Sequence, residues 1–334
     1  MQNSQGVPSG GQVFSGVVRR DAIEDMSAAV SNFFDLRAEQ LEPGPMRCQI
    51  DFIAAGNTFF YLEHYPLRTH LAGELLHNRF GFALPVHGPS LQYAGEQMDQ
   101  CRLASAITGE EMDVYAPGGL QQFVVLLDHE RLLRLADEAG LPVETQRALR
   151  PGRQTMPLAA KPRAVAALAQ RMRAMLQEAA AGRLSLDADS LQDWLYAETI
   201  SLLEVKEVPC GRPPAAVLVR RAIETTEAHR GPVPISQLCS LLRVSPGTLE
   251  TAFKAVTGVT PHAFFLRRRL NKARSVLLSQ EADLVRVTDV ALELGFSELG
   301  RFAVRYRQMF GESPSETLRR RAVTVAAAGW PSFS

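Results

Sequence analysis

The sequence predicts an α+β chain of two domains, an N-terminal domain built mainly of short strands and a C-terminal domain built of helices. Short alternating apolar runs, separated by Gly and Pro, recur between residues 13 and 127 and are typical of a sandwich or barrel. After residue 158 the apolar positions recur at steps of three and four, which is typical of helices. Within this helical part a helix-turn-helix pattern occurs twice.

The N-terminal domain is expected to begin with one amphipathic segment at residues 23–34. Seven short runs follow it, and the Gly and Pro residues between them mark turns. The expected strands are CQIDFIAAG, TFFYLEHY, HLAGELLHN, RFGFALPVHG, CRLASAITG, EMDVYAPGG and LQQFVVLLD.

Two further helical patterns precede the repeated motif. In residues 161–181 the apolar positions form a narrow stripe with the spacing of a seam for a partner helix, and packing against the chain's own strands is the alternative. This stripe consists of Val165, Leu168, Met172, Met175 and Ala179. A second stripe consists of Leu191, Trp194, Leu195, Leu202 and Val205.

The two copies of the repeat occupy residues 235–261 and 287–314. Their first halves match at an offset of 52 residues and their second halves at 53, so the second turn is one residue longer. Because a Ser after the turn is a preferred N-cap, each copy is expected to be two short helices joined by a tight turn. The matched positions are Ile235, Leu238, Cys239, Leu242, Val244 and Ser245 with Val287, Val290, Ala291, Leu294, Phe296 and Ser297, then Leu249, Phe253, Gly258 and Pro261 with Phe302, Tyr306, Gly311 and Pro314.

In this motif the second helix enters the major groove of DNA while the first crosses the backbone. A plain helical hairpin is the alternative, and the repetition with matching Gly-x-Ser/Thr-Pro exits favours DNA binding. Residues 213–334 contain 17 Lys and Arg against 10 Asp and Glu, a net charge of +7, whereas the first 212 residues contain 19 against 26, a net of −7. The basic domain is therefore expected to contact phosphates.

The shared residues carry a resemblance to a known family. The second copy contains G-F-S-x4-F-x3-Y-x3-F-G-x-S-P, and PHAFFLRRRLNKARSVLL lies between the copies. The chain resembles the C-terminal DNA-binding domain of AraC/XylS-type transcription regulators over about a third of its length, and PHAFFLRRRLNKARSVLL resembles the bridging helix of that domain. The residues that carry the resemblance are Leu238, Gly295, Phe296, Ser297, Phe302, Tyr306, Gly311, Ser313 and Pro314.

Base contacts are expected from the side of each second helix that points away from its apolar stripe. Arg301 is the strongest single candidate, because a guanidinium can form a bidentate contact with guanine, and by resemblance this position contacts bases. The second helix of the first copy departs from the family, which usually offers Arg or Gln where Gly247, Glu250 and Thr251 stand. In the second copy, Gly300 stands where the family commonly has a small hydroxyl residue. The base-contact candidates are Gly247, Thr248, Glu250, Thr251, Leu299, Arg301, Val304 and Arg305.

Phosphate contacts are expected from basic residues on the bridging helix and on the two second helices. At helical spacing Phe265, Leu270 and Leu277 face the two lobes, which leaves Arg267, Arg268 and Lys272 outward, although a solvated helix face explains such a run equally well. The phosphate candidates are Lys254, Arg267, Arg268, Lys272 and Arg307.

For the N-terminal domain the resemblance implies a cupin-like barrel that holds a small effector, followed by a dimerisation segment at the stripe of Val165 to Ala179. Four His residues fall within residues 64–87, but no H-x-H pair occurs, so we expect no metal, no cofactor and no enzymatic activity. The effector-pocket candidates, taken from one face each of two strands, are Phe60, Leu62, His64, Phe80, Phe82 and Leu84.

The expected domain boundaries follow composition. They are a disordered arm at 1–12, the barrel at 13–157, the dimerisation helices at 158–205, a Pro- and Gly-containing linker at 206–216, the tandem helix-turn-helix domain at 217–321 and a disordered tail at 322–334. No apolar run is long enough to span a membrane, so a cytoplasmic location is expected. Cys48, Cys101, Cys210 and Cys239 are too scattered for a zinc site or a disulfide framework.

The sequence thus predicts a dimeric, sequence-specific, DNA-binding transcription regulator with an effector-binding N-terminal domain. Its expected partners are double-stranded promoter DNA and a second copy of the chain, with RNA polymerase and a small-molecule effector as further candidates. One alternative is a ligand-independent regulator whose barrel serves dimerisation or a protein partner. Another is a cupin-type metalloenzyme fused to a DNA-binding domain.

Overall fold

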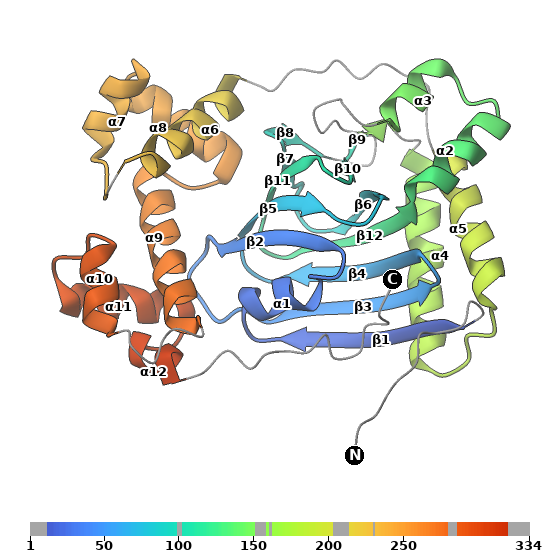
Figure 1. Ribbon diagram of the computed structural model, residues 1–334, viewed down its shortest axis with the longest axis horizontal. Helices are drawn as coiled ribbons and strands as arrows, with labels where there is room; N and C mark the ends of the chain where they lie inside the picture. The colour runs from blue at the N-terminus through green and yellow to red at the C-terminus, as the bar shows by residue number, and fades with distance from the viewer. Residues whose placement is uncertain are drawn as a thin grey trace.

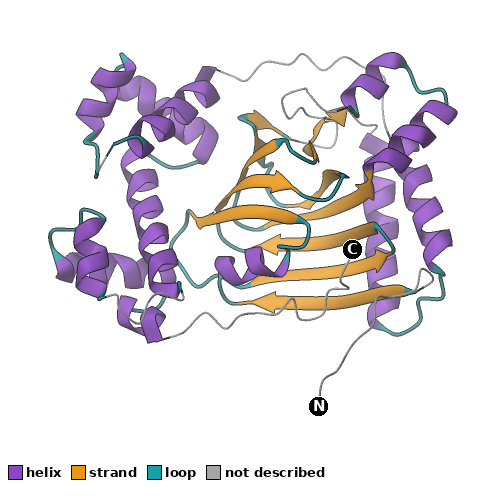
Figure 2. Ribbon diagram, viewed as in Figure 1, coloured by secondary structure: helices purple, strands orange, loops and turns teal. Residues whose placement is uncertain are grey.

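A computed structural model of the protein describes residues 12–98, 102–150, 158–159, 162–202, 214–229, 231–279 and 286–319. Strands with several helices form the N-terminal domain, and a separate group of helices forms the C-terminal domain beside it (Figure 1). Figure 2 shows the same division, with the strands gathered between two sets of helices.

Two antiparallel sheets make up most of the N-terminal domain. The six-stranded sheet has the order β1 (Val13–Arg20), β3 (Cys48–Ala55), β4 (Thr58–Tyr65), β12 (Leu120–Asp128), β6 (Arg79–His87) and β10 (Ser105–Ile107). The five-stranded sheet has the order β2 (Phe34–Gln40), β5 (Thr69–Leu75), β11 (Glu111–Ala116), β7 (Gln92–Tyr93) and β8 (Glu96–Gln97). A short pair joins β13 (Leu158–Ala159) to β9 (Arg102–Leu103).

The six-stranded sheet is buried on both faces, which explains its nearly continuous apolar runs. Because side chains alternate along a strand, Phe59 and Tyr61 of β4 face the core between the sheets, and Phe60 faces the core beneath the helices. Val125 of β12, paired with Phe60, lies in the same helix-facing core. The alternation therefore sorts each strand's residues between two environments.

The expected strand-built domain is confirmed as two antiparallel sheets, whereas the cupin-like barrel stays a prediction. Among the described residues, every strand ladder runs within one sheet and none joins the six-stranded sheet to the five-stranded sheet. The core between them gathers apolar side chains from both sheets and from α1 (Ile23–Ala29).

Helices α2 (His129–Glu138), α4 (Pro162–Ala180) and α5 (Ala188–Leu202) cover the outer face of the six-stranded sheet (Figure 1), and α3 (Val143–Ala148) follows α2. Asp128 caps α2, since its side chain accepts a hydrogen bond from the Arg131 amide at 2.8 Å.

The proposed dimer stripe of α4 packs inside the chain. Val165, Leu168 and Met172 are 0% exposed and lie in the core beneath the helices, and Met175 and Ala179 are partly buried against the same core. The sheet and α5 thus occupy the place that the spacing predicted for a partner helix, and Val165, Leu168 and Met172 are not accessible to a second copy. Helical spacing reveals that a stripe is buried, but not by what.

Among the described residues, seven helices form the C-terminal domain. They are α6 (Pro214–Glu227), α7 (Ile235–Leu242), α8 (Pro246–Thr257), α9 (Pro261–Leu278), α10 (Val287–Glu293), α11 (Leu299–Phe310) and α12 (Pro314–Arg319). The first helix-turn-helix unit consists of α7 and α8, and the second consists of α10 and α11. Each unit has its own core, and α9, which spans the residues expected for the bridging helix, contributes to both.

The turns of the two units differ as the repeat offset suggested. Ser245 caps α8 by accepting a hydrogen bond from the Thr248 amide at 3.1 Å, as expected. In the second unit the N-cap is Glu298 instead of Ser297, and it makes no side-chain capping bond. Both second helices end at a left-handed glycine, Gly258 with φ 73° and Gly311 with φ 76°, where a residue with a Cβ would be strained.

Several expected segments fall outside the described residues, namely most of the arm at 1–12, the end of the dimerisation helices at 203–205 with Val205, residues 206–213 of the linker and the tail at 322–334. α6 already begins at Pro214, so the linker ends earlier than the predicted residue 216.

Cys48 and Cys239 are free and buried, whereas Cys101 and Cys210 lie outside the described residues. In the part of the chain that the structure covers, no helix combines the length and apolar character needed to cross a bilayer.

Candidate nucleic-acid interface, interdomain contacts and cavity

Helix α8 presents a polar outer face. Gly247, Thr248, Glu250 and Thr251 are exposed, as expected for base-contact candidates, while Leu249 is fully buried against the unit's core. The ammonium of Lys254, also exposed, lies 2.7 Å from the Glu250 carboxylate one turn away. This ion pair lowers the repulsion that Glu250 would otherwise exert on a phosphate.

Helix α11 presents a mixed basic and apolar face. Arg301 and Arg305 are exposed, and Leu299 and Val304 remain 40% and 58% exposed between them. The Arg301 guanidinium is 2.8 Å from Glu298, an exposed ion pair of small energetic weight. Base edges need donors for guanine and apolar groups for the thymine methyl, and this face offers both.

The basic residues of α9 do not share one environment. Lys272 is exposed, as is the α11 candidate Arg307. Arg267 donates to the carbonyl of Leu41, and Arg268 is bound to two carboxylates, so the expectation that both contact phosphate is corrected. Both guanidinium groups are committed to the N-terminal domain or to its boundary.

Arg268 is the centre of an ion-pair cluster between the domains. Its Nε lies 3.1 Å from Glu39 at the end of β2, and its Nη2 lies 2.8 Å from Glu227 of α6. Glu39 also contacts the buried ring of His70, whose other nitrogen lies 2.8 Å from Asp113. The cluster joins three strands of the five-stranded sheet, β2, β5 and β11, to two helices of the C-terminal domain, α6 and α9.

The charges within this cluster support each other. Burial alone raises the pKa of Glu39, but the hydrogen bond with His70 and the charge of Arg268 outweigh it and lower the pKa to about 2. Burial opposes the protonated form of His70, yet its hydrogen bonds with Asp113 and Glu39 raise its pKa above the usual value. The cluster is thus stable with Glu39 ionised.

Asn271 of α9 joins the edge of the five-stranded sheet. Its Oδ1 accepts from the Gln40 amide at 3.0 Å, and its Nδ2 donates to the Gln40 carbonyl at 2.8 Å. The Gln40 side chain in turn donates to the Met309 carbonyl of α11 at 2.9 Å, and the Gly44 amide donates to the same carbonyl at 3.1 Å. Side-chain and backbone groups thus fix α9 and the end of α11 against the N-terminal domain.

An ion pair and an apolar contact extend this interface. Arg274 lies 3.0 Å from Glu24 of α1 and 2.6 Å from Glu312. Leu41 and Tyr115 of the N-terminal domain belong to the core of the first helix-turn-helix unit. The Tyr115 ring stacks on His70 with centroids 4.3 Å apart.

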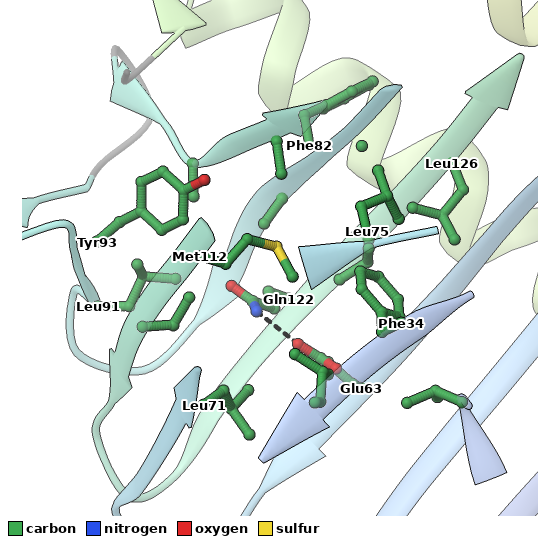
Figure 3. Close-up of a pocket in the computed structure, with 18 of the residues that line it drawn as sticks. Phe34, Glu63, Leu71, Leu75, Phe82, Leu91, Tyr93, Met112, Gln122 and Leu126 are labelled. Carbon is green, nitrogen blue, oxygen red and sulfur yellow. Dashed lines mark hydrogen bonds between the residues drawn. The ribbon is translucent and has the colours of Figure 1, made fainter. Parts of the chain in front are cut away.

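A cavity of about 80 Å³ lies between the two sheets (Figure 3). Phe34, Leu71, Leu75, Met112 and Leu126 surround it, and Glu63 and Gln122 form its polar end. Its walls come from both sheets and from α1.

Most of the expected pocket residues do not border this cavity. Phe82 borders the cavity, but Phe60, Phe80 and Leu84 are buried in the core beneath the helices, and Leu62 is partly buried against that core. His64, on the same face of β4, is half-buried. Both faces of β4 are rich in aromatic residues, so alternation alone cannot tell the face that borders a cavity from the face that packs against helices.

Glu63 and Gln122 are the site residues that sequence reasoning missed. Gln122 Nε2 donates to Glu63 Oε1 at 2.5 Å, and the Tyr65 hydroxyl donates to Glu63 Oε2 at 3.0 Å. Burial raises the pKa of Glu63 to about 7 despite these bonds. A signal was present in TFFYLEHY, where a Glu stands between Tyr61 and Tyr65 on an otherwise aromatic face.

The titratable neighbours of Glu63 stay protonated near neutral pH. Burial, with a contribution from the Glu63 charge, raises the pKa of Cys48 to about 12 and the pKa values of Tyr61 and Tyr65 well above 10. Near neutrality Glu63 is therefore the carboxyl that changes charge at this end of the cavity.

The histidines that raised the metal alternative are dispersed. His70 is buried at the domain interface, His64 is half-buried on β4, and His77 and His87 are exposed. Among the residues that the structure covers, no three His, Cys, Asp or Glu side chains are grouped in a way that could hold a metal ion.

The two helix-turn-helix units, their exposed second helices and the basic C-terminal domain define the class of a helix-turn-helix DNA-binding protein. Comparison with known proteins agrees, since a helix-turn-helix domain model matches residues 238–320. The chain is 42% identical over 86 residues to the XylDLEGF operon transcriptional activator 2 of Pseudomonas putida, which covers 26% of this chain and 55% of that protein. It is 40% identical over 74 residues to the HTH-type transcriptional activator RhaS of Escherichia coli, which covers 22% of this chain and 26% of that protein.

Solved structures give similar matches. A probable AraC family transcriptional regulator from Rhodopseudomonas palustris CGA009 is 43% identical, with 31% of this chain and 96% of that chain covered and a TM-score of 0.29. The AraC-like transcriptional activator CuxR is 13% identical over 78% of this chain and 94% of that chain, with a TM-score of 0.37, which is too low to assign the N-terminal domain.

The chain belongs to the AraC/XylS family of DNA-binding transcription regulators. The matched relatives are named as transcription regulators and not as enzymes. The chain spans about half, or less, of the length of these curated relatives.

Proposed function

We propose that the protein binds promoter DNA sequence-specifically through α8 and α11. We further propose that a small effector, bound between the two sheets, changes the affinity for this DNA. The observation that carries the proposal is the exposure of one face on each second helix. That face is rich in donors and small apolar groups on α11 and in hydroxyl groups on α8. By the geometry of the motif, the two helices enter successive major grooves about 34 Å apart.

The two helices would favour different bases. On α11, Arg301 and Arg305 suit guanine, and Leu299 and Val304 suit the thymine methyl. On α8, threonine hydroxyls can donate or accept, and Glu250 can accept from cytosine N4. We therefore expect α11 to provide most of the sequence discrimination and α8 a weaker, less common preference.

The effector part of the proposal rests on two elements that border the cavity and also hold α9. Phe34 and Leu36 of β2 line the cavity, and the same strand ends in Glu39 and Gln40, which contact Arg268 and Asn271. Helix α1 lines the cavity and carries Glu24, the partner of Arg274. An effector that displaces β2 or α1 would alter how α9 is held, in proportion to its differential affinity for the two arrangements.

Dimerisation, which the resemblance implies, would use a surface other than the buried stripe of α4. Two copies would double the phosphate contacts and raise the affinity for a two-site promoter. Sedimentation of the full chain with and without DNA tests this, and a monomer in both conditions would contradict it.

The DNA-binding proposal is tested by selecting bound sequences from random genomic fragments with the full chain at near-physiological salt, followed by footprinting. We expect protection over about two helical turns for each protomer, with two unequal half-sites. Arg301→Ala should abolish the enrichment, whereas the control Arg319→Ala, which removes the same charge from α12, should keep it. Failure of the unmodified chain to enrich any sequence, with and without effector, would refute the proposal.

A further inference from the structure

The polar end of the cavity is built to accept hydrogen bonds. Glu63 supplies a carboxylate, and Gln122 Oε1 is buried with no hydrogen-bond partner among the described residues. Both side chains are about 95% buried. A buried acceptor without a partner costs about 1–3 kcal/mol, so a ligand that donates to it recovers that free energy.

The nearby donors are already engaged. The Gln122 amide and the Tyr65 hydroxyl donate to Glu63, and the Tyr93 hydroxyl donates to the Ser105 carbonyl. Ser27 of α1 donates to the Ile23 carbonyl at 3.2 Å. A ligand that needs donors therefore finds few of them in this cavity.

The charge at the cavity is of one sign. Of the described residues that line it, Glu63 is the one with an ionisable carboxyl group, and no Lys, Arg or His is among them. A buried carboxylate is costly unless a positive charge pairs with it, and a second carboxylate brought beside it would repel it. The aromatic side chains of Tyr61 and Phe34 offer faces that a cation favours.

We propose that the effector is a small organic amine that enters in its ammonium form, donates to Glu63 and Gln122 Oε1, and places its apolar body among Leu71, Leu75 and Met112. This inference rests on the proposed function of the cavity as the effector site. A cavity of 80 Å³ is smaller than the roughly 150 Å³ that admits benzene, so a short aliphatic amine fits better than an aromatic one.

The experiment compares three probes of nearly equal size: n-butylamine, n-butanol and butyrate. Binding to the full chain is measured by isothermal titration calorimetry and by the rise in Tm at pH 7.5. We expect saturable binding of n-butylamine, at least tenfold weaker binding of n-butanol, and no binding of butyrate. Tighter binding of butyrate or n-butanol than of n-butylamine, or no binding of any probe, would overturn the amine assignment.

Variants locate the site. Glu63→Gln keeps the size and an acceptor for Tyr65 but removes the charge, and should weaken n-butylamine at least tenfold without weakening n-butanol. Gln122→Met removes the unpaired acceptor and should weaken n-butylamine severalfold. The control Glu74→Gln, on an exposed position of β5, should leave all three affinities unchanged. Unchanged affinity for n-butylamine in both Glu63→Gln and Gln122→Met would refute the site.

A DNA-binding readout separates this inference from the proposed function. The affinity of the full chain for its selected DNA is measured with and without saturating n-butylamine. Binding of n-butylamine at Glu63 with no change in DNA affinity would sustain the ligand class and refute the role as effector site. A change in DNA affinity produced through the cavity by butyrate or n-butanol instead would sustain the effector site and refute the amine.

Discussion

Replacing Asn271 by Ala should release the C-terminal domain from the edge of the five-stranded sheet. The Asn271 side chain satisfies both the amide and the carbonyl of Gln40, at 3.0 and 2.8 Å, and it is buried at the interface. The variant leaves these two backbone groups without their partner, at about 1–3 kcal/mol for each. The expected loss of docking free energy is therefore about 2–6 kcal/mol.

Hydrogen–deuterium exchange of the full chain measures this loss directly. We expect faster exchange at the end of β2 and in residues 41–44, with unchanged exchange in the buried strands β4 and β12. Ser275→Ala, at an exposed position on the same helix, serves as the control and should leave the exchange of β2 unchanged. If β2 in Asn271→Ala stays as protected as in the unmodified chain, Asn271 does not hold the domains together.

Four further outcomes test the rest of the structure. Arg301→Ala should cost about 1–3 kcal/mol on a selected site and little on random DNA, and equal losses on both would make it a phosphate contact. Lys272→Ala should flatten the salt dependence of DNA binding by about one unit of slope, and an unchanged slope would place it off the DNA. Phe302→Ala should destabilise the second unit by about 3–5 kcal/mol in denaturant unfolding, and a fully stable variant would contradict its burial. The pKa of Glu63 is raised from 4.5 to about 7, so its stabilising effect is complete below pH 4.5 and is lost, by about 3 kcal/mol, as pH rises through 7. Glu63→Gln should remove that pH dependence, and identical unfolding profiles for both proteins would refute it.

The C-terminal domain was predictable because its signals are local. The bridging helix spans the expected residues, and Ser245 caps α8 as the sequence suggested. Each of these features depends on residues within one or two turns of each other, which the sequence displays directly. The extra residue in the second turn was also visible, although the shift of the cap to Glu298 was not.

The sites that the sequence could not place depend on distant partners. Arg268 looked exposed because its partner Glu39 is 229 residues away, and the stripe of α4 looked unpartnered because the sheet beneath it comes earlier in the chain. The cavity required a choice between the two faces of β4, and only the facing five-stranded sheet decides it. Periodicity gives the faces of each element but not their pairing.

The contact between Asn271 and Gln40 also protects the protein from self-association. β2 is the outer strand of its sheet, where β5 is its one neighbour among the described strands, and α9 occupies the other side at Gln40. Withdrawal of α9 would expose unpaired amide and carbonyl groups along an edge that other chains can extend. Any mechanism that frees the DNA-binding domain therefore uncovers a strand edge, and variants that undock it should aggregate faster as their concentration rises.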